Sequence, residues 1–281
     1  ETPVEKRSNI LGGSTTYSLV ASGRQSEVSI VGIVGNDFPS EGHSLYKSYA
    51  SDLSDLKIAE GKTFQWGGRY HENWDDRDTL FTELGVFSDF RPVLTKSNKN
   101  RSHILLANIH PELQQSVIQQ NQNPNAIVVI DTMNLWIETT LPSLEKVLSV
   151  SNFLLINESE AFLLTNENNI NNAASSLLKM GPEVVVIKKG SRGAELFSLT
   201  EHITVDAFPV NNVVDPTGAG DVFAGAFVAS LANEDSKETA LLNASASASI
   251  SIESFGIEKL QSASNNEIND RINFLNKTLK S

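Results

Sequence analysis

Cysteine is absent from this chain of 281 residues. Disulfide bonds, thiolate metal sites and a cysteine nucleophile are therefore excluded. Long apolar runs are lacking too, because the longest, around residues 222–232, contains glycine and is too short to span a membrane. No charged and then apolar leader with a cleavage site opens the sequence given. We therefore expect a soluble, cytoplasmic protein.

Positive charge is scarce: 22 Lys and Arg stand against 34 Asp and Glu, which gives a formal net charge of −12. An acidic protein repels nucleic acid and anionic membranes unless it carries a local basic patch, and this sequence has none. We expect neither nucleic acid nor membrane as a partner. A site for phosphate groups in such a protein must rely on local dipoles, a metal ion and a few cations.

Two common nucleotide-binding motifs are missing as well. Residues 61–63 (Gly-Lys-Thr) match the end of a P-loop, but Leu56 occupies the position of its first glycine. A dinucleotide fingerprint after residues 218–220 would need glycine where Phe223 stands. The five histidines contain no His-Glu-x-x-His or other metal-ligand cluster.

What the sequence does contain is an alternation of short β-rich runs with helix-length stretches. Strands are expected at 28–34, 103–107, 126–130, 153–156 and 184–187. Helices are expected between them at 40–51, 111–122, 142–150, 158–165 and 170–180. This alternation predicts a largely parallel sheet covered by helices on both faces. A strand pair at 195–205 follows, and then three helices, the last at 265–279.

Residues 62–87 break this alternation. Two β-prone runs flank a charged turn at 75–78, which predicts a hairpin that carries Phe64, Trp66 and Tyr70. Such a hairpin either covers the site as a lid or pairs with another subunit, so a homodimer through the lid is one expectation.

The run at 214–221 reads Val-Asp-Pro-Thr-Gly-Ala-Gly-Asp and leads directly into a small-residue, apolar stretch at 222–231. We expect a buried helix there. Its N-terminus and the N–H groups of Gly218, Ala219 and Gly220 make a site for an anion such as a phosphoryl group. Asp221 stands at the junction, where it can take a proton from a hydroxyl brought up to that group. The combination predicts phosphorylation of a hydroxyl.

A purely structural explanation also exists, because Asp is a preferred N-cap and Gly-Ala-Gly before a helix can be a simple tight turn. The complete pattern, which continues three residues later with Gly-Ala-Phe at 225–227, favours function. It resembles the C-terminal signature of the PfkB, or ribokinase-like, carbohydrate kinase family. The resemblance implies a doubly wound α/β fold, with a mainly parallel sheet flanked by helices and a small β-sheet lid. It also implies MgATP-dependent phosphorylation of an alcohol group on a small sugar or polyol.

Other segments extend this resemblance over nearly the whole chain. Residues 1–281 are expected to form one kinase domain, with a lid from residues 1–16 and 60–90. Gly12 and Gly13 resemble the N-terminal Gly-Gly at which the backbone approaches the substrate. Asn157 and Glu160 resemble the Asn-x-x-Glu motif associated with magnesium, water and phosphate, so both are candidate metal-site residues. The candidate nucleotide-binding residues are Asn157, Lys188, Gly190, Gly193, Thr217 and Ser245.

The chain departs from the family pattern in two places. Thr15, Thr16 and Tyr17 fill a stretch where the family often has Asn, and Ser245 stands where many members have Asn. In addition, the family's first strand, which supplies an Asp that binds substrate hydroxyls, is expected to be missing from the sequence given.

Substrate identity stays open. The polar residues on the lid or at predicted strand ends that suit the recognition of hydroxyls are Arg69, Asn108, Asp131 and Asn134. Each is equally explained as a hydrogen-bonded loop residue. An aromatic face from Phe64, Trp66 or Tyr17 suits a base, which keeps a nucleoside kinase as an alternative. A catalytically silent relative that binds a small molecule is a further alternative, although such a protein would be expected to lose Asp221 or the glycines.

Overall fold

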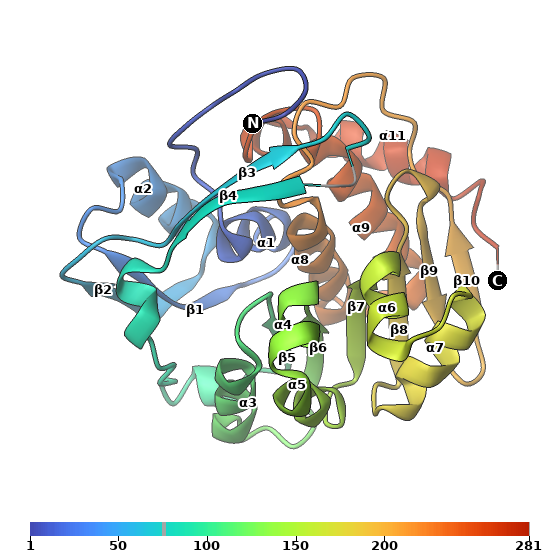
Figure 1. Cartoon of the computed structure of the whole chain (residues 1–281), viewed down its shortest axis with the longest axis horizontal. Helices are drawn as coiled ribbons and strands as arrows, with labels where there is room; N and C mark the ends of the chain where they lie inside the picture. Colours follow the sequence, from blue (N-terminus) through green and yellow to red (C-terminus); the bar gives the residue numbers. More distant parts are fainter. Residues whose placement is uncertain (75–76, 281) are drawn as a thin grey trace.

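The computed structural model describes residues 1–74 and 77–280. Its centre is a six-stranded sheet in the order β10-β9-β8-β7-β6-β5 (Figure 1). The parallel strands are β5 (His103–Leu106), β6 (Ile127–Asp131), β7 (Phe153–Asn157) and β8 (Val184–Lys188). Two antiparallel strands complete one edge, β9 (Ala194–Phe197) and β10 (His202–Val205). The expected strand pair at 195–205 therefore forms.

Helices cover both faces of this sheet, and the strand side chains alternate between two cores. Val129, Leu155 and Val186 share a core with the helices on one face, which are α1 (Ser14–Ser22), α8 (Ala219–Ala232) and α9 (Lys237–Ser251). The adjacent residues Ile130 and Leu154 face the other core, formed with α5 (Leu141–Leu148), α6 (Glu158–Thr165) and α7 (Ile170–Lys179). Burial on both faces explains why these strands are continuous apolar runs in the sequence. The doubly wound, mainly parallel α/β fold is confirmed.

The remaining helices differ in part from the expected ones. They are α2 (Ser40–Tyr49), α3 (Pro111–Gln120), α4 (Asn134–Thr139), α10 (Glu258–Ser262) and α11 (Asn265–Leu275). Four helices, not three, follow β10 in the described part of the chain, because the short α10 gave no periodic signal. Helix α1 was not predicted either, since most of its residues are buried and its sequence lacks a polar stripe.

A separate parallel pair consists of β1 (Ser29–Gly35) and β2 (Asp52–Ala59). The expected strand at 28–34 therefore forms, but its strand partner is β2 and not the six-stranded sheet. β2 was not predicted, because its polar residues resemble a loop. One of them, Asp55, is buried and accepts hydrogen bonds from Thr95 N (2.9 Å) and Asn98 Nδ2 (2.8 Å). Such pairing makes a buried carboxylate tolerable in a strand.

The predicted hairpin is present as the antiparallel strands β3 (Gln65–Tyr70) and β4 (Arg77–Glu83). Figure 1 shows it as a ribbon apart from the six-stranded sheet and the β1–β2 pair. The expected charged turn at 75–78 includes residues 75 and 76, which lie outside the described residues. Glu1 pairs with the free edge of β3, because its N-terminus donates to Gly68 O (2.8 Å) and its carbonyl accepts from Tyr70 N (2.9 Å).

The outer surface of this hairpin exposes the apolar side chains of Leu80 and Phe81. The pairing of two copies through this surface stays a prediction. None of the helices within residues 1–74 and 77–280 has both the length and the hydropathy needed to cross a membrane.

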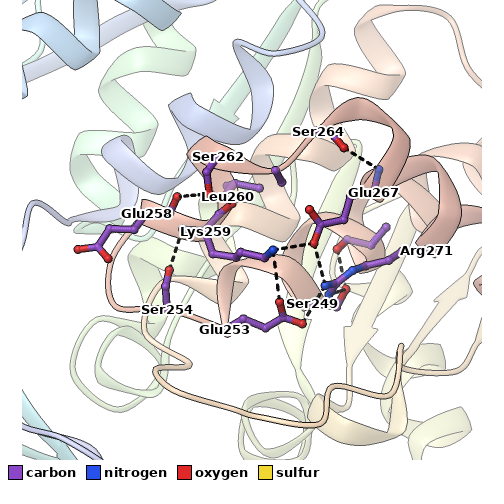
Figure 2. A network of polar contacts seen from close by, with 12 residues as sticks. Ser249, Glu253, Ser254, Glu258, Lys259, Leu260, Ser262, Ser264, Glu267 and Arg271 are labelled. Atoms are coloured by element: carbon purple, nitrogen blue, oxygen red, sulfur yellow. Dashed lines mark hydrogen bonds and ion pairs between the residues drawn. The ribbon is translucent and has the colours of Figure 1, made fainter.

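A polar network fixes the C-terminal helices to one another (Figure 2). Arg271 on α11 donates to Ser249 Oγ on α9 (3.0 Å) and to Glu253 (2.8 Å). Lys259 on α10 pairs with Glu267 on α11 (2.8 Å). Since Arg271 is buried and its charge is matched by carboxylates, this network holds α10 and α11 against α9.

Candidate active site

The motif at residues 214–221 forms the entry to α8. Gly218 is the residue before the helix, with φ of 78°, a left-handed conformation that favours glycine. The ring of Tyr17 lies directly against it, since a Cβ added to Gly218 would sit 2.4 Å from the ring. The same ring lies 3.5 Å from the position of a Cβ on Gly12. Tyr17 therefore joins the predicted Gly-Gly segment to the entry of α8.

The backbone N–H groups at this entry are only partly used within the protein. Ala219 N donates to Pro216 O (3.1 Å), so the N–H of Ala219 serves the turn in this conformation. Within the described chain, the N–H groups of Gly218 and Gly220 have no acceptor. Of the three predicted anion-binding amides, two are thus free at the positive end of a buried helix.

Asp221 lies in the first turn of α8 and is half-buried. Burial raises the pKa of its carboxyl from 3.8 to about 7, and the nearby carboxylate of Asp131 adds to the increase. The side chain of Ser14, together with Lys188 and Arg77, acts in the opposite direction and lowers this pKa. A carboxyl with a pKa near neutrality, beside free amides, is suited to accept a proton during a reaction.

Lys188 provides the positive charge beneath this carboxyl. It ends β8, and its Nζ lies 3.1 Å from Oδ1 of Asp131 at the end of β6 and 3.4 Å from the position of a Cβ on Gly220. Burial alone lowers the pKa of Lys188, but the carboxylates of Asp131, Glu160 and Asp221 raise it above its usual value. The carboxyl ends of parallel strands thus meet the N-terminus of α8, as expected for a ligand site in an open α/β sheet.

Glu160 and Asn157, the candidate metal-site residues, form a capping box at the start of α6. Asn157 Oδ1 accepts from Glu160 N (2.8 Å), and Glu160 Oε2 accepts from Asn157 N (3.1 Å). Burial raises the pKa of Glu160, and Lys188 partly offsets this increase. The cap uses Oε2 of Glu160, so in the described part of the chain its other carboxylate oxygen, Oε1, takes no part in it.

No cluster of three or more His, Asp or Glu suited to a metal exists among residues 1–74 and 77–280. This donor set fits a magnesium ion that is held mainly by water and phosphate oxygens, with one carboxylate near it.

The other predicted residues are only partly brought together. Thr217 belongs to the site, because its Oγ1 lies 3.4 Å from the hydroxyl of Tyr70 on β3. Asn108 follows β5 at the same edge of the sheet as Asp131, where its Oδ1 accepts from Trp136 Nε1 (2.8 Å). Asn134 is exposed at the start of α4.

Gly13 is the N-cap of α1, and Gly190 and Gly193 border the turn after β8. Ser245 lies on α9, where its hydroxyl is buried without a partner in the described part of the protein.

Arg69 was predicted at the site and lies elsewhere. Its side chain is 57% exposed and pairs with Glu1 (2.7 Å). The adjacent residue Tyr70 is 8% exposed and faces Thr217. Successive side chains of a strand point to opposite faces, so Arg69 faces away from α8. The direct cross-strand partner of Tyr70 is Arg77 on β4, which lies on the same face of the hairpin as Tyr70.

Sequence reasoning also missed Ser14 at the site, and it considered Tyr17 only as an aromatic face for a base and not as a neighbour of Gly218 and Asp221. Neither belongs to a motif with a chemical signature, and both come to Asp221 only because α1 packs against α8. Ser18 of α1 donates to the carbonyl of Asp221 (3.0 Å), which fixes this packing. The available signal was the position of Tyr17, four residues after Gly13 of the Gly-Gly segment.

Comparison with known proteins identifies the family. The model of the pfkB family carbohydrate kinases matches residues 91–262. The chain belongs to this family. The resemblance found in the sequence is therefore confirmed.

Two curated relatives illustrate the range within the family. This pfkB family protein is 29% identical to cytidine kinase from Thermococcus kodakarensis over 209 residues, 72% of this chain and 73% of the relative. It is 34% identical to ribokinase from Bacillus subtilis over 117 residues, 42% of this chain and 38% of that relative. The ribokinase match thus spans less than half of either protein.

Among solved structures, an E. coli protein provisionally assigned as ribokinase II, in complex with ATP and Mg²⁺, has a TM-score of 0.81. The two are 20% identical, and the superposition covers 95% of this chain and 90% of that one. At this identity the likeness shows a common fold.

Proposed function

We propose that this pfkB family protein transfers the γ-phosphoryl group of ATP to a hydroxyl of a small sugar or polyol. The observation that supports this most directly is the position of Asp221, in the first turn of α8 beside the free N–H groups of Gly218 and Gly220. A base and an anion-binding site at one point are what transfer to a hydroxyl requires.

In the proposed reaction, Asp221 accepts the proton of the substrate hydroxyl as its oxygen bonds to the γ-phosphorus. The N–H groups of Gly218 and Gly220, with the N-terminus of α8, stabilise the negative charge of the transferred group. Lys188 compensates part of the charge that three carboxylates place here. Tyr70 and the hairpin limit the access of water, which would otherwise compete as acceptor. When bound, Mg²⁺ supplies charge neutralisation of the phosphates, and Glu160 is the residue that would hold it through water.

A nucleoside is the second candidate acceptor. Curated relatives of both kinds match most of this chain: a cytidine kinase over 72% of it and a ribokinase from Staphylococcus aureus, 30% identical, over 63%. An aromatic pair near Asn108 suits a base: Trp136 on α4 packs edge-on against His110, the N-cap of α3, with ring centroids 5.2 Å apart. A catalytically silent binding protein is disfavoured because Asp221 and both free glycine amides are present.

The test measures ADP release from MgATP across a panel of sugars, polyols and nucleosides. We expect one chemical class to stimulate ADP release to a turnover of about 1–100 s⁻¹, as is typical of kinases. Stimulation by nucleosides alone would select the second candidate. No stimulation by any compound, together with no binding of MgATP, would contradict a kinase and favour the silent binder.

Activity is expected to increase with pH across neutrality. The folded-state pKa of Asp221 is raised to about 7, and only the deprotonated carboxylate can act as base. The value of kcat/KM, which reports the free enzyme, should therefore fall about tenfold per pH unit below this pKa and level off above it. Initial rates at subsaturating acceptor between pH 5 and 9 test this. A flat profile would show that Asp221 is not the titrating base.

A further inference from the structure

The inner face of the β3–β4 hairpin carries an arginine that the sequence did not single out. Arg77 on β4 is the direct partner of Tyr70 on β3 in the antiparallel register. Directly opposed residues of such a pair project their side chains from the same face. Since the hydroxyl of Tyr70 lies 3.4 Å from Thr217 Oγ1, Arg77 also projects toward the entry of α8.

A cation–π contact with Trp66 positions the side chain of Arg77. The guanidinium of Arg77 lies over the ring of Trp66, 5.7 Å from its centroid. The ring itself lies on the inner face, because a Cβ added to Gly68 would sit 2.2 Å from it. Its Nε1 donates to Thr79 Oγ1 (3.3 Å), the residue opposite Gly68. Stacking on a fixed aromatic ring restricts where the long side chain of Arg77 can point.

Negative charge exceeds positive charge at the site, so a second cation would be stabilised there. Asp131, Glu160 and Asp221 are three carboxylates around one buried amine, and Lys188 is already paired with Asp131 (3.1 Å). Arg77 is close enough to lower the pKa of both Asp221 and Glu160. Arrival of a triphosphate adds more negative charge at this point, which is unfavourable unless another cation approaches.

From this arrangement, and on the basis of the proposed kinase function, we infer that Arg77 is a catalytic residue delivered by the hairpin. Its guanidinium donates N–H bonds to oxygens of the transferring phosphoryl group and keeps its own proton throughout. The bond from γ-phosphorus to the substrate oxygen forms, and the bond from γ-phosphorus to the bridging oxygen of ADP breaks. The hydroxyl proton goes to Asp221, and the charge on the phosphoryl oxygens is shared among Arg77 and the free amides.

An alternative use of Arg77 is the recognition of an acceptor that itself carries a carboxylate or phosphate. The position of the charge favours the transferred group. Arg77 influences both Glu160, the proposed metal-side residue, and Asp221, the proposed base. In the proposed reaction the transferred phosphoryl group passes between these two residues, whereas an acceptor would contact only the side of Asp221.

The chain offers a matched control for the test. Arg69 and Arg77 lie on paired strands of one hairpin, but Arg69 faces outward and pairs with Glu1. We expect Arg77→Met to lower kcat by about 10²–10³-fold at saturating acceptor and MgATP. Arg69→Met should change kcat less than about twofold. Arg77→Lys should recover only part of the loss, because an amine lacks the planar fork and the stacking surface.

A binding measurement supplies a readout independent of turnover. MgADP with aluminium fluoride, in the presence of the acceptor, imitates the transferring phosphoryl group. Arg77→Met should weaken binding of this complex about 10²-fold while leaving MgADP affinity nearly unchanged.

Equal behaviour of Arg77→Met and Arg69→Met in both assays would overturn the inference. A change in KM confined to anionic acceptors, with kcat intact, would overturn it in favour of acceptor recognition. A wild-type protein without kinase activity would instead refute the proposed function on which the inference rests.

Discussion

Replacing Asp221 with Asn is expected to lower kcat by about 10²–10⁴-fold, because general-base assistance to the attacking hydroxyl is lost. The amide has nearly the same shape, so MgATP should bind with close to wild-type affinity. ADP release under saturating conditions and nucleotide titration by calorimetry measure the two effects separately. A variant with near-parental turnover would exclude Asp221 as the base.

The same substitution should make the protein more stable, which separates loss of chemistry from loss of fold. Burial raises the pKa of Asp221 from 3.8 to about 7, so between these pH values the folded protein binds a proton that the unfolded chain releases. The free energy of unfolding of the wild type therefore decreases as pH rises through this range. Because Asn carries no charge to desolvate, Asp221→Asn should gain about 2 kcal/mol at pH 8, after a discount for partial exposure, and almost nothing at pH 4. Urea denaturation at the two pH values measures this difference.

Replacing Lys188 with Met is expected to destabilise the protein by about 3–5 kcal/mol, the usual cost of leaving one partner of a buried ion pair alone. The unpaired partner is Asp131, whose side chain is 8% exposed. Denaturant unfolding measures the loss. Adding Asp131→Asn to the variant should restore a large part of it, because the second substitution removes the isolated charge.

Lys188→Met should also change the chemistry at Asp221. Lys188 lowers the pKa of Asp221, so without it the acid limb of kcat/KM should move to higher pH. Lys189→Met is the matched control: Lys189 is the next residue, but its Nζ pairs with Glu195 (2.7 Å). If both variants kept the wild-type pH profile, Lys188 would not belong to the electrostatics of the base.

The parts that could be predicted from the sequence depend on local signals. The strands β5 to β8 are buried on both faces, so each is a continuous apolar run that stands out without knowledge of its neighbours. The motif at 214–221 is contiguous, and one turn plus one helix N-terminus bring its glycines and Asp221 together. For such features, sequence proximity is also spatial proximity.

The unpredicted parts depend on contacts between distant residues. β2 is a strand because its backbone pairs with β1, and its polar residue Asp55 is accommodated by Thr95 and Asn98, 40 and 43 residues away. A polar strand of this kind has no local signature. Arg69 and Arg77 could not be distinguished, because the register of the hairpin decides which of them faces Asp221. The pairing of Lys188 with Asp131 joins two strands through a sheet order that the sequence does not specify.

By itself, then, the amino-acid sequence determined the order of the strands from β5 to β10, the family and the position of the proposed base at the start of α8, because each is encoded within a few consecutive residues. Only the tertiary structure decided which side chains surround that base. Ser14, Tyr17, Arg77, Asp131 and Lys188 come from four separate segments, α1, β4, β6 and β8, and the packing of α1 on α8, the sheet order and the hairpin register place them around one carboxyl. Contacts between distant residues therefore set the pKa of Asp221, and no local sequence pattern predicts these contacts.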